Sequence, residues 1–134
     1  MTTGEAAVRR FYAELWNAWE LGLVDEILSP ELRFRGSRGA VMSGRDAFRR
    51  YAEETREAFP DWHNRVDDLV ANGDRVAARL TWTGTQSGAF EGRPPTGARV
   101  EYVGAGFFRV DHGVIHEAWV VGDTEAFRRT LEAP

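Results

Sequence analysis

Apolar residues return with two different periods along this chain, and the change of period divides it into two parts. In the first part they recur every three or four positions from Val8 onward, which is typical of a helix with one buried face. We expect this helix to end near Gly22, because glycine often follows the last helical turn. A second, short helix is predicted at 24–28 and a third from just after Ser43 to about Phe59, and each is soon followed by a proline.

Polar residues suited to helix capping precede the first and third predicted helices. Thr2-x-x-Glu5 and Ser43-x-x-Asp46 both have the spacing of a capping box, in which the first side chain accepts a hydrogen bond from a backbone N–H of the first turn. We therefore expect Thr2 and Ser43 to be the N-cap residues.

In the second part of the chain apolar and polar residues alternate singly, which is typical of strands with one buried face. Glycine-containing turns separate the longer alternating segments. Helices followed by consecutive antiparallel strands predict an α+β fold, and 134 residues without repeat or linker predict a single domain over 1–134. The predicted strands are 32–35, 62–71, 75–86, 99–110 and 113–122, with a loop at 36–44 and a closing helix at 123–131.

Charge and hydropathy limit the partners of this domain. The formal net charge is −4, and a nucleic-acid partner would need a basic face that neutralises phosphates. No apolar run approaches the ~20 residues of a membrane span, and the first residues lack the basic-then-apolar pattern of a signal peptide. We expect no nucleic-acid partner, no membrane association and a cytoplasmic location.

Missing residue types restrict the chemistry. The chain has no cysteine, and all 17 basic residues are arginine, so a thiolate nucleophile and a lysine Schiff base are excluded. The three histidines show no i,i+4 pair of the kind that binds metals. A phosphate-binding glycine loop and a Gly-x-Ser-x-Gly elbow are also missing. We therefore expect neither a metal nor a cofactor.

A long Gly- and Pro-rich connection joins two of the predicted strands. Residues 84–97 have the pattern Gly-Thr-x-x-Gly-x-Phe-x-Gly-x-Pro-Pro-Thr-Gly, and residues 113–123 read Gly-Val-Ile-His-Glu-Ala-Trp-Val-Val-Gly-Asp. Together with Arg9-Arg10-Phe11-Tyr12 and Phe59-Pro60-Asp61, these segments resemble the SnoaL-like polyketide cyclase family over nearly the whole chain.

This resemblance implies a cone-shaped α+β barrel of the nuclear transport factor two and ketosteroid isomerase superfamily. In such a fold a strongly curved sheet surrounds the N-terminal helices and an internal, mostly apolar pocket for a small molecule. Trp16, Trp62 and Trp82 are the tryptophans most suited to wall that pocket for a flat, conjugated ligand, although core packing is the general role of tryptophan. The expected substrate-binding residues are Tyr12, Trp16, Phe34, Trp62, Trp82, Gln86, Phe108 and Val120.

The resemblance also implies a homodimer. Strict alternation along the last strand would place His116, Ala118 and Val120 towards the pocket. The opposite, outer face would then carry large apolar side chains that need a cover. We expect a second copy of the chain to cover this outer face, which is made of Ile115, Glu117, Trp119 and Val121.

Several positions depart from the family's acid–base residues. Val120 stands where the aldol-type cyclases carry an aspartate, and Gly106 and Phe107 occupy the stretch where they carry a histidine. Gln86 replaces another frequent histidine. Asp123 matches a second family aspartate, but it lies at a strand–helix junction where it can instead cap the last helix.

The candidates left for acid–base catalysis are His116, Asp123 and His63, with Asp61 as a further carboxylate; burial would favour the neutral form of each group. Three functions remain open. The first is a cofactor-free cyclase, isomerase or hydratase acting on an apolar, aromatic or polyketide-like substrate. The second is a small-molecule-binding or accessory protein, and the third is a dimerisation domain with a vestigial pocket.

Overall fold

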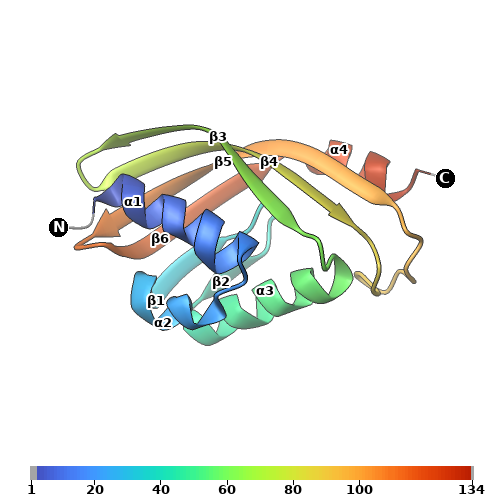
Figure 1. Ribbon diagram of the computed structural model, residues 1–134, viewed down its shortest axis with the longest axis horizontal. Coiled ribbons are helices and arrows are strands. Elements are labelled where there is room, and N and C mark those ends of the chain that lie inside the picture. Colours follow the sequence, from blue (N-terminus) through green and yellow to red (C-terminus); the bar gives the residue numbers. More distant parts are fainter. Residues whose placement is uncertain (1–2, 134) are drawn as a thin grey trace.

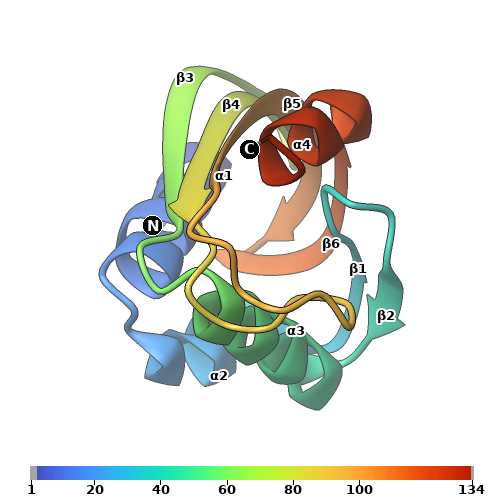
Figure 2. The same cartoon turned by 90° about the vertical axis from the view of Figure 1, so that its right-hand side faces the viewer.

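The computed structural model describes residues 3–133 and shows a six-stranded sheet that curves around the N-terminal helix, with a second long helix across its open side (Figures 1 and 2). The α+β architecture predicted from the sequence is confirmed. The sheet is curved but not closed, so its concave face and the helices together enclose an interior.

The first helix is shorter than its apolar pattern predicts. Helix α1 (Gly4–Arg10) begins with the Thr3 side chain accepting a hydrogen bond from the Ala6 N–H at 3.0 Å, while the predicted cap Thr2 lies outside the described residues. The helix continues as a π-helical segment, η1 (Phe11–Asn17). It ends there, well before Gly22, because Trp19 adopts a left-handed backbone with φ of 58°.

Short elements lead from this helix into the sheet. A 3₁₀ turn, η2 (Leu21–Leu23), and α2 (Val24–Ile27) precede strand β1 (Leu28–Arg35). The predicted loop then contains a short strand, β2 (Val41–Ser43), which pairs with β1.

Helix α3 (Arg45–Ala58) does not begin with the predicted capping box. Its N-cap is Gly44, with φ of 87° and no side-chain capping bond, because Ser43 is held opposite Arg33 in the β1–β2 pair. The predicted N-cap role of Ser43 is therefore wrong.

The four long strands begin and end within one residue of their predicted bounds. They are β3 (His63–Asn72), β4 (Arg75–Thr85), β5 (Arg99–Asp111) and β6 (Val114–Gly122), and α4 (Thr124–Leu131) closes the fold. The strand order is β2-β1-β6-β5-β4-β3. Neighbouring strands are antiparallel except β1 and β6, which run parallel.

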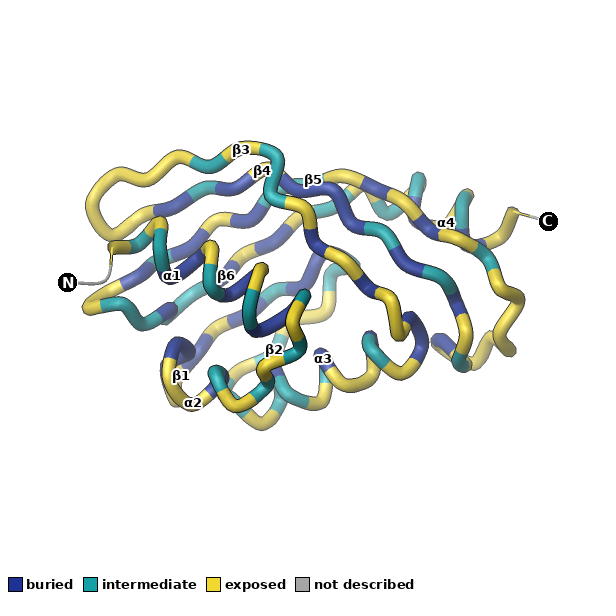
Figure 3. The backbone as a smooth tube through the Cα atoms, in the orientation of Figure 1, coloured by how far each residue is buried: buried dark blue, intermediate teal, exposed yellow. Residues whose placement is uncertain are grey.

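Buried and exposed residues alternate along β5, so one face of the sheet is lined by core side chains and the other faces out (Figure 3). The alternation fails once in β6. Arg109 lies opposite Glu117, but Val110 lies opposite Ile115, so His116 is an extra residue in a β-bulge. Ile115 is consequently fully buried, and the prediction that it lies on the outer face is wrong.

The connection between β4 and β5 is organised by a buried glutamine. The Gln86 side chain donates from Nε2 to the carbonyl oxygens of Gly88 and Pro94, each at 3.2 Å, and to that of Arg93 at 3.4 Å. Its Oε1 accepts from the Thr96 hydroxyl at 3.3 Å. One side chain thus holds the loop backbone from within. Among the helices in residues 3–133, none is long and apolar enough to cross a membrane.

Candidate functional site

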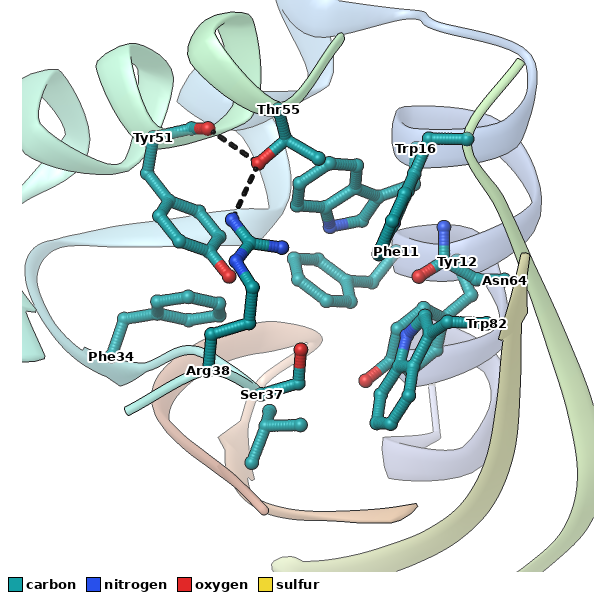
Figure 4. A pocket seen from close by; sticks show the side chains of 12 residues that line it. Phe11, Tyr12, Trp16, Phe34, Ser37, Arg38, Tyr51, Thr55, Asn64 and Trp82 are labelled. Atoms are coloured by element: carbon teal, nitrogen blue, oxygen red, sulfur yellow. Dashed lines mark hydrogen bonds between the residues drawn. The ribbon is translucent and has the colours of Figure 1, made fainter. Parts of the chain in front are cut away.

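Aromatic side chains from the helices and the sheet meet around a cavity inside the cone (Figure 4). Helix η1 faces α3 across it, and four strands contribute one side chain each. The lining residues are Phe11, Tyr12, Trp16, Phe34, Ser37, Arg38, Tyr51, Thr55, Trp62, Asn64, Trp82 and Val120.

Ring-to-ring packing fixes the wall of this cavity. The Trp16 ring centroid is 5.8 Å from that of Phe48 and 6.2 Å from that of Tyr51, and both pairs are edge-to-face. The Trp82 ring lies 4.8 Å from Tyr102. Such pairs contribute about 0.5–1.5 kcal/mol each beyond the area they bury, so they stabilise the wall.

Little space is left at the centre. The free volume of the cavity is about 20 Å³, which is room for roughly one water molecule. A wider groove of about 380 Å³ adjoins it, between α3 and the loop around Phe90. Arg38, Tyr51 and Thr55 line both spaces, so these three side chains form the boundary between the cavity and the groove.

Arg38 is the charged residue of the lining. It lies in the turn after β1, and its Nη2 donates to the Thr55 hydroxyl at 3.0 Å. Burial disfavours the guanidinium charge, but the oxygens of Tyr51, Tyr102 and Glu91 outweigh this and hold the pKa of Arg38 above its ordinary value. The cavity therefore contains a permanent positive charge.

Two tyrosines, Tyr12 in the cavity wall and Tyr102 behind it, are held in the neutral form. Burial raises the pKa of Tyr12 far above its ordinary value, and the nearby Tyr51 and Tyr102 add to the effect. Burial also raises the pKa of Tyr102 to about 12, although Arg38 and the hydrogen bond with Ser37 oppose it. The Ser37 and Tyr102 hydroxyl oxygens are 2.6 Å apart.

An asparagine pair closes the end of the cavity near β3. The Asn17 Oδ1 accepts from the backbone N–H of Asn64 at 2.9 Å and from its Nδ2 at 3.1 Å, and the Asn17 Nδ2 donates to the Asn64 carbonyl at 2.8 Å. These bonds tie the end of η1 to the start of β3. They also fix the amide of Asn64, which lines the cavity.

Most of the predicted substrate-binding residues meet in this cavity. Two do not line it: Phe108 packs behind the wall, with its ring 5.9 Å from Tyr12, and Gln86 holds the β4–β5 loop. The expectation that Trp16 walls a cavity with Trp62 or Trp82 is confirmed. The predicted residues that line it are Tyr12, Trp16, Phe34, Trp62, Trp82 and Val120.

The predicted catalytic residues lie elsewhere. Asp123 accepts from the Ala126 N–H at 3.0 Å and is the N-cap of α4. His63 is exposed at the start of β3, and His116 lies in the bulge of β6. None of the three lines the cavity, so a catalytic role for them stays a prediction. Within the described residues, no group of three His, Asp or Glu side chains is placed to hold a metal ion.

The polar residues that do line the cavity were not found from the sequence. Arg38 lies in a glycine-flanked turn, where an arginine ordinarily faces solvent. Its neighbours Tyr51 and Thr55 come from α3, and they occupy positions read as one side of an amphipathic helix. No local pattern distinguishes a residue that faces a cavity from one that faces the core.

The comparison with protein families covers nearly the whole chain. Residues 6–131 match the family described as SnoaL-like polyketide cyclase. No curated protein matches the sequence.

Solved structures share the complete architecture. A SnoaL-like protein from Jannaschia sp. CCS1 superposes with a TM-score of 0.87 at 25% identity, over 98% of this chain and 92% of that one. IdmH of Streptomyces antibioticus, named as a candidate polyketide cyclase, gives 0.83 at 28% identity over 96% and 98%. AclR of Streptomyces galilaeus, named as a candidate hydroxylase, gives 0.82 at 31% identity over 96% and 80%.

Proposed function

Because the chain belongs to the SnoaL-like polyketide cyclase family, we propose that it is a cofactor-free enzyme of the cyclase or isomerase type. Its substrate is an apolar, aromatic or polyketide-like small molecule. One observation carries this proposal: Trp16, Trp62 and Trp82 wall a single cavity, which also contains a permanent charge at Arg38. Aromatic walls favour flat ligands, and a few placed polar groups orient them.

Substrate entry requires a side chain to move. A free volume of about 20 Å³ does not hold an aromatic ring, whereas the adjoining groove of about 380 Å³ does. Arg38 lies on the boundary between them and belongs to the turn after β1 rather than to a strand. We place the bound substrate across this boundary, with its ring system between the tryptophans and its remainder in the groove.

A second candidate function, ligand binding without turnover, is favoured by the chemistry of the lining. The residues around the cavity include no carboxylate and no imidazole, so the usual proton-transfer groups are missing there. Tyr12 and Tyr51 are the phenols that face it. An enzyme using this cavity would rely on them or on His116 after a rearrangement of β6.

The Val120→Asp variant tests catalysis, since Val120 lines the cavity at the position where we expect the family's aspartate. General acid–base catalysis contributes roughly 10²–10⁴-fold, so Val120→Asp should raise turnover of a polyketide cyclase substrate by about that factor. Val120→Asn is the control of matched size that transfers no proton.

Two outcomes would refute parts of this proposal. If the wild type turns over the substrate and Val120→Asp is no faster, Val120 is not a vacant catalytic position. If native mass spectrometry instead shows an aromatic ligand retained unchanged by wild type and Val120→Asp alike, the protein is a binding protein.

We further propose that the protein is a homodimer through the outer face of β5 and β6. Phe107 and Trp119 lie directly opposite each other there and are 51% and 43% exposed, with Val103 and Val121 beside them. A contiguous apolar patch on a sheet needs a cover. The sheet presents this patch on its outer face, where a second copy can cover it.

Light scattering tests this assembly. The wild type should have twice the mass of one chain at micromolar concentration, and Trp119→Glu should have the mass of one. Ala13→Glu is the control, because Ala13 is exposed on η1, away from the sheet, and the substitution adds the same charge. A monomeric wild type would overturn the proposed dimer.

A further inference from the structure

We propose that the cavity selects planar, conjugated ligands that carry an ionised oxygen, a phenolate or an enolate, and that the Arg38 guanidinium binds this oxygen. The inference rests on the proposed function in one respect only, namely that the aromatic cavity is the ligand site. It adds the charge state of the ligand and the residue that recognises it.

The turn that carries Arg38 is built to direct it inward. The Gly36 N–H donates to the Ala40 carbonyl and the Gly39 N–H to the Gly36 carbonyl, each at 2.9 Å, and Gly39 has φ of 98°. A Cβ on Gly36 would lie 2.3 Å from the Tyr51 hydroxyl. Only glycine lets the turn pack this closely on α3, and this packing places the Arg38 side chain among the cavity residues (Figure 4).

Arg38 has no carboxylate partner among the ion pairs of residues 3–133. Other arginines of the chain do: Arg49 lies 2.6 Å from Asp25, and Arg93 lies 2.9 Å from Glu132. The hydrogen bond of Arg38 goes to the Thr55 hydroxyl, which in turn donates to the Tyr51 carbonyl. The exposed Glu91 carboxylate helps to keep Arg38 charged but forms no ion pair with it. A neutral hydroxyl does not cancel the charge, and the guanidinium has further N–H donors to offer a ligand.

Aromatic rings surround the guanidinium instead. Its Cζ lies 5.2 Å from the ring centroids of Tyr51 and Phe90, 5.6 Å from Trp62 and 5.9 Å from Phe127. Ring faces stabilise a buried cation without supplying a counter-anion. A planar anion between these rings would complete the charge balance and would also stack, which is why we infer a conjugated anion.

Acidic residues outside the cavity argue against attraction of a preformed anion over long range. Glu54, Glu57 and Glu91 line the adjoining groove, and all are exposed. A ligand that enters as a neutral phenol or enol and ionises next to Arg38 avoids this repulsion. The structure therefore predicts that binding lowers the pKa of the ligand's hydroxyl group.

Binding of para-nitrophenol tests this directly, because its phenolate absorbs visible light and para-nitroanisole is a neutral analogue of similar size. The wild type should bind the phenolate 10- to 100-fold more tightly than Arg38→Met does, since a hydrogen bond to a charged group contributes about 1.5–3 kcal/mol. Affinity for para-nitroanisole should differ less than threefold between the two proteins. Arg50→Met is the control, because Arg50 is exposed on α3 and its loss changes the net charge equally.

A proportional loss of both probes in Arg38→Met, or equal affinity of the wild type for both, would overturn the inference. If Arg38→Met fails to fold, Arg38→Lys keeps a positive charge, and it should retain a lowered pKa of bound para-nitrophenol. No such lowering in wild type or Arg38→Lys would overturn it as well. Phenolate selectivity without any turnover would refute the proposed enzyme and leave this inference standing.

Discussion

Phe107 and Phe108 are neighbours in β5, yet they lie in opposite environments. Phe108 is 2% exposed and packs its ring against Phe11 and Tyr12, whereas Phe107 is 51% exposed on the outer face. Both faces of β5 and β6 carry large apolar side chains. The inner face is covered by helices of the same chain and the outer face is not, so alternation alone does not tell which apolar face is the core.

The two faces also differ in their glycines. A Cβ on Gly104 would lie 2.1 Å from the Val121 carbonyl and 2.7 Å from the Trp82 ring, and one on Gly106 would lie 3.2 Å from the Tyr12 hydroxyl. Glycine on the inner face thus makes room for the aromatic side chains of the cavity. The inner face is therefore apolar and also fitted closely to its neighbouring side chains, whereas the outer face is apolar without such close packing.

The matched pair Phe108→Ala and Phe107→Ala should show the largest difference between the faces. Removing a buried phenylalanine leaves a cavity and costs about 3–5 kcal/mol in the free energy of unfolding. The same change at the exposed Phe107 should stay within about 0.5 kcal/mol in a monomeric background such as Trp119→Glu. Chemical denaturation of both variants measures this difference.

Equal losses in that background would mean that the outer face is covered within a single chain. A loss at Phe107 that occurs only in the wild-type background, and grows with protein concentration, would sharpen the comparison. It would assign the cover of the outer face to the second copy.

Overpacking should separate the faces by a smaller amount. Gly106→Ala places a methyl group 2.8 Å from the Phe108 ring, which should cost about 1–3 kcal/mol in stability. Ala105→Val, on the outer side of the same strand, adds more volume and should stay within about 0.5 kcal/mol in the Trp119→Glu background. Thermal unfolding of the two variants measures this difference. If Gly106→Ala unfolds at the same temperature as the wild type, the inner face can relax to accept the methyl group.

Removing a buried polar side chain should destabilise the protein, as changes on the inner face do. Gln86→Ala removes the partner of three loop carbonyls, and leaving such groups unpaired costs about 1–3 kcal/mol each when water cannot replace it. Because the loop lies at the surface, we expect the total near the lower end of this range. Hydrogen exchange of residues 86–97 should accelerate with little change in β5, and unchanged exchange would contradict the role of Gln86.

The loss of stability at low pH should arise in part from Asp67, on the outer side of the sheet. We expect it to be the smallest of these effects. Asp67 accepts from the Thr81 hydroxyl and from Arg65 Nε, both at 2.6 Å, and these bonds lower the pKa of its carboxyl. Its stabilising effect is therefore complete above the ordinary carboxyl pKa near 4 and is lost as the pH falls through the lower folded value. The stability difference between wild type and Asp67→Asn should shrink over that range. A difference that does not depend on pH would mean that the charge of the Asp67 carboxylate is not the cause of the stabilisation.

The sequence predicted the strands well because each long strand has one buried face, which period-two alternation records directly. It failed at Trp19, Ser43 and Ile115, where tertiary contacts override local pattern. The apolar face continues past Asn17, but the backbone turns left-handed at Trp19. Ser43 has the capping pattern, but β1 holds it as a strand residue.

The sequence predicted the aromatic residues that wall the cavity, but it did not predict the charged residue there, Arg38. Aromatic residues in strands and helices are natural candidates for a cavity, and Trp16, Trp62 and Trp82 do line it. Arg38 reaches it from the turn after β1, and its partners Thr55 and Phe90 lie far along the chain. The residues next to Arg38 in the sequence do not indicate these contacts, because the contacts depend on how the turn packs against α3.

The parallel pairing of β1 with β6 has a consequence for how the chain reaches its native state. Phe34 of β1 lies opposite Ala118 of β6, so β1 gains this neighbour only after β6 has been synthesised. During translation, β3, β4 and β5 can pair in order as hairpins, while β1 has the three-residue β2 as a partner. Non-local pairing of this kind slows folding, so the cavity, whose wall includes both Phe34 and Val120, should be the last part of the nascent chain to form.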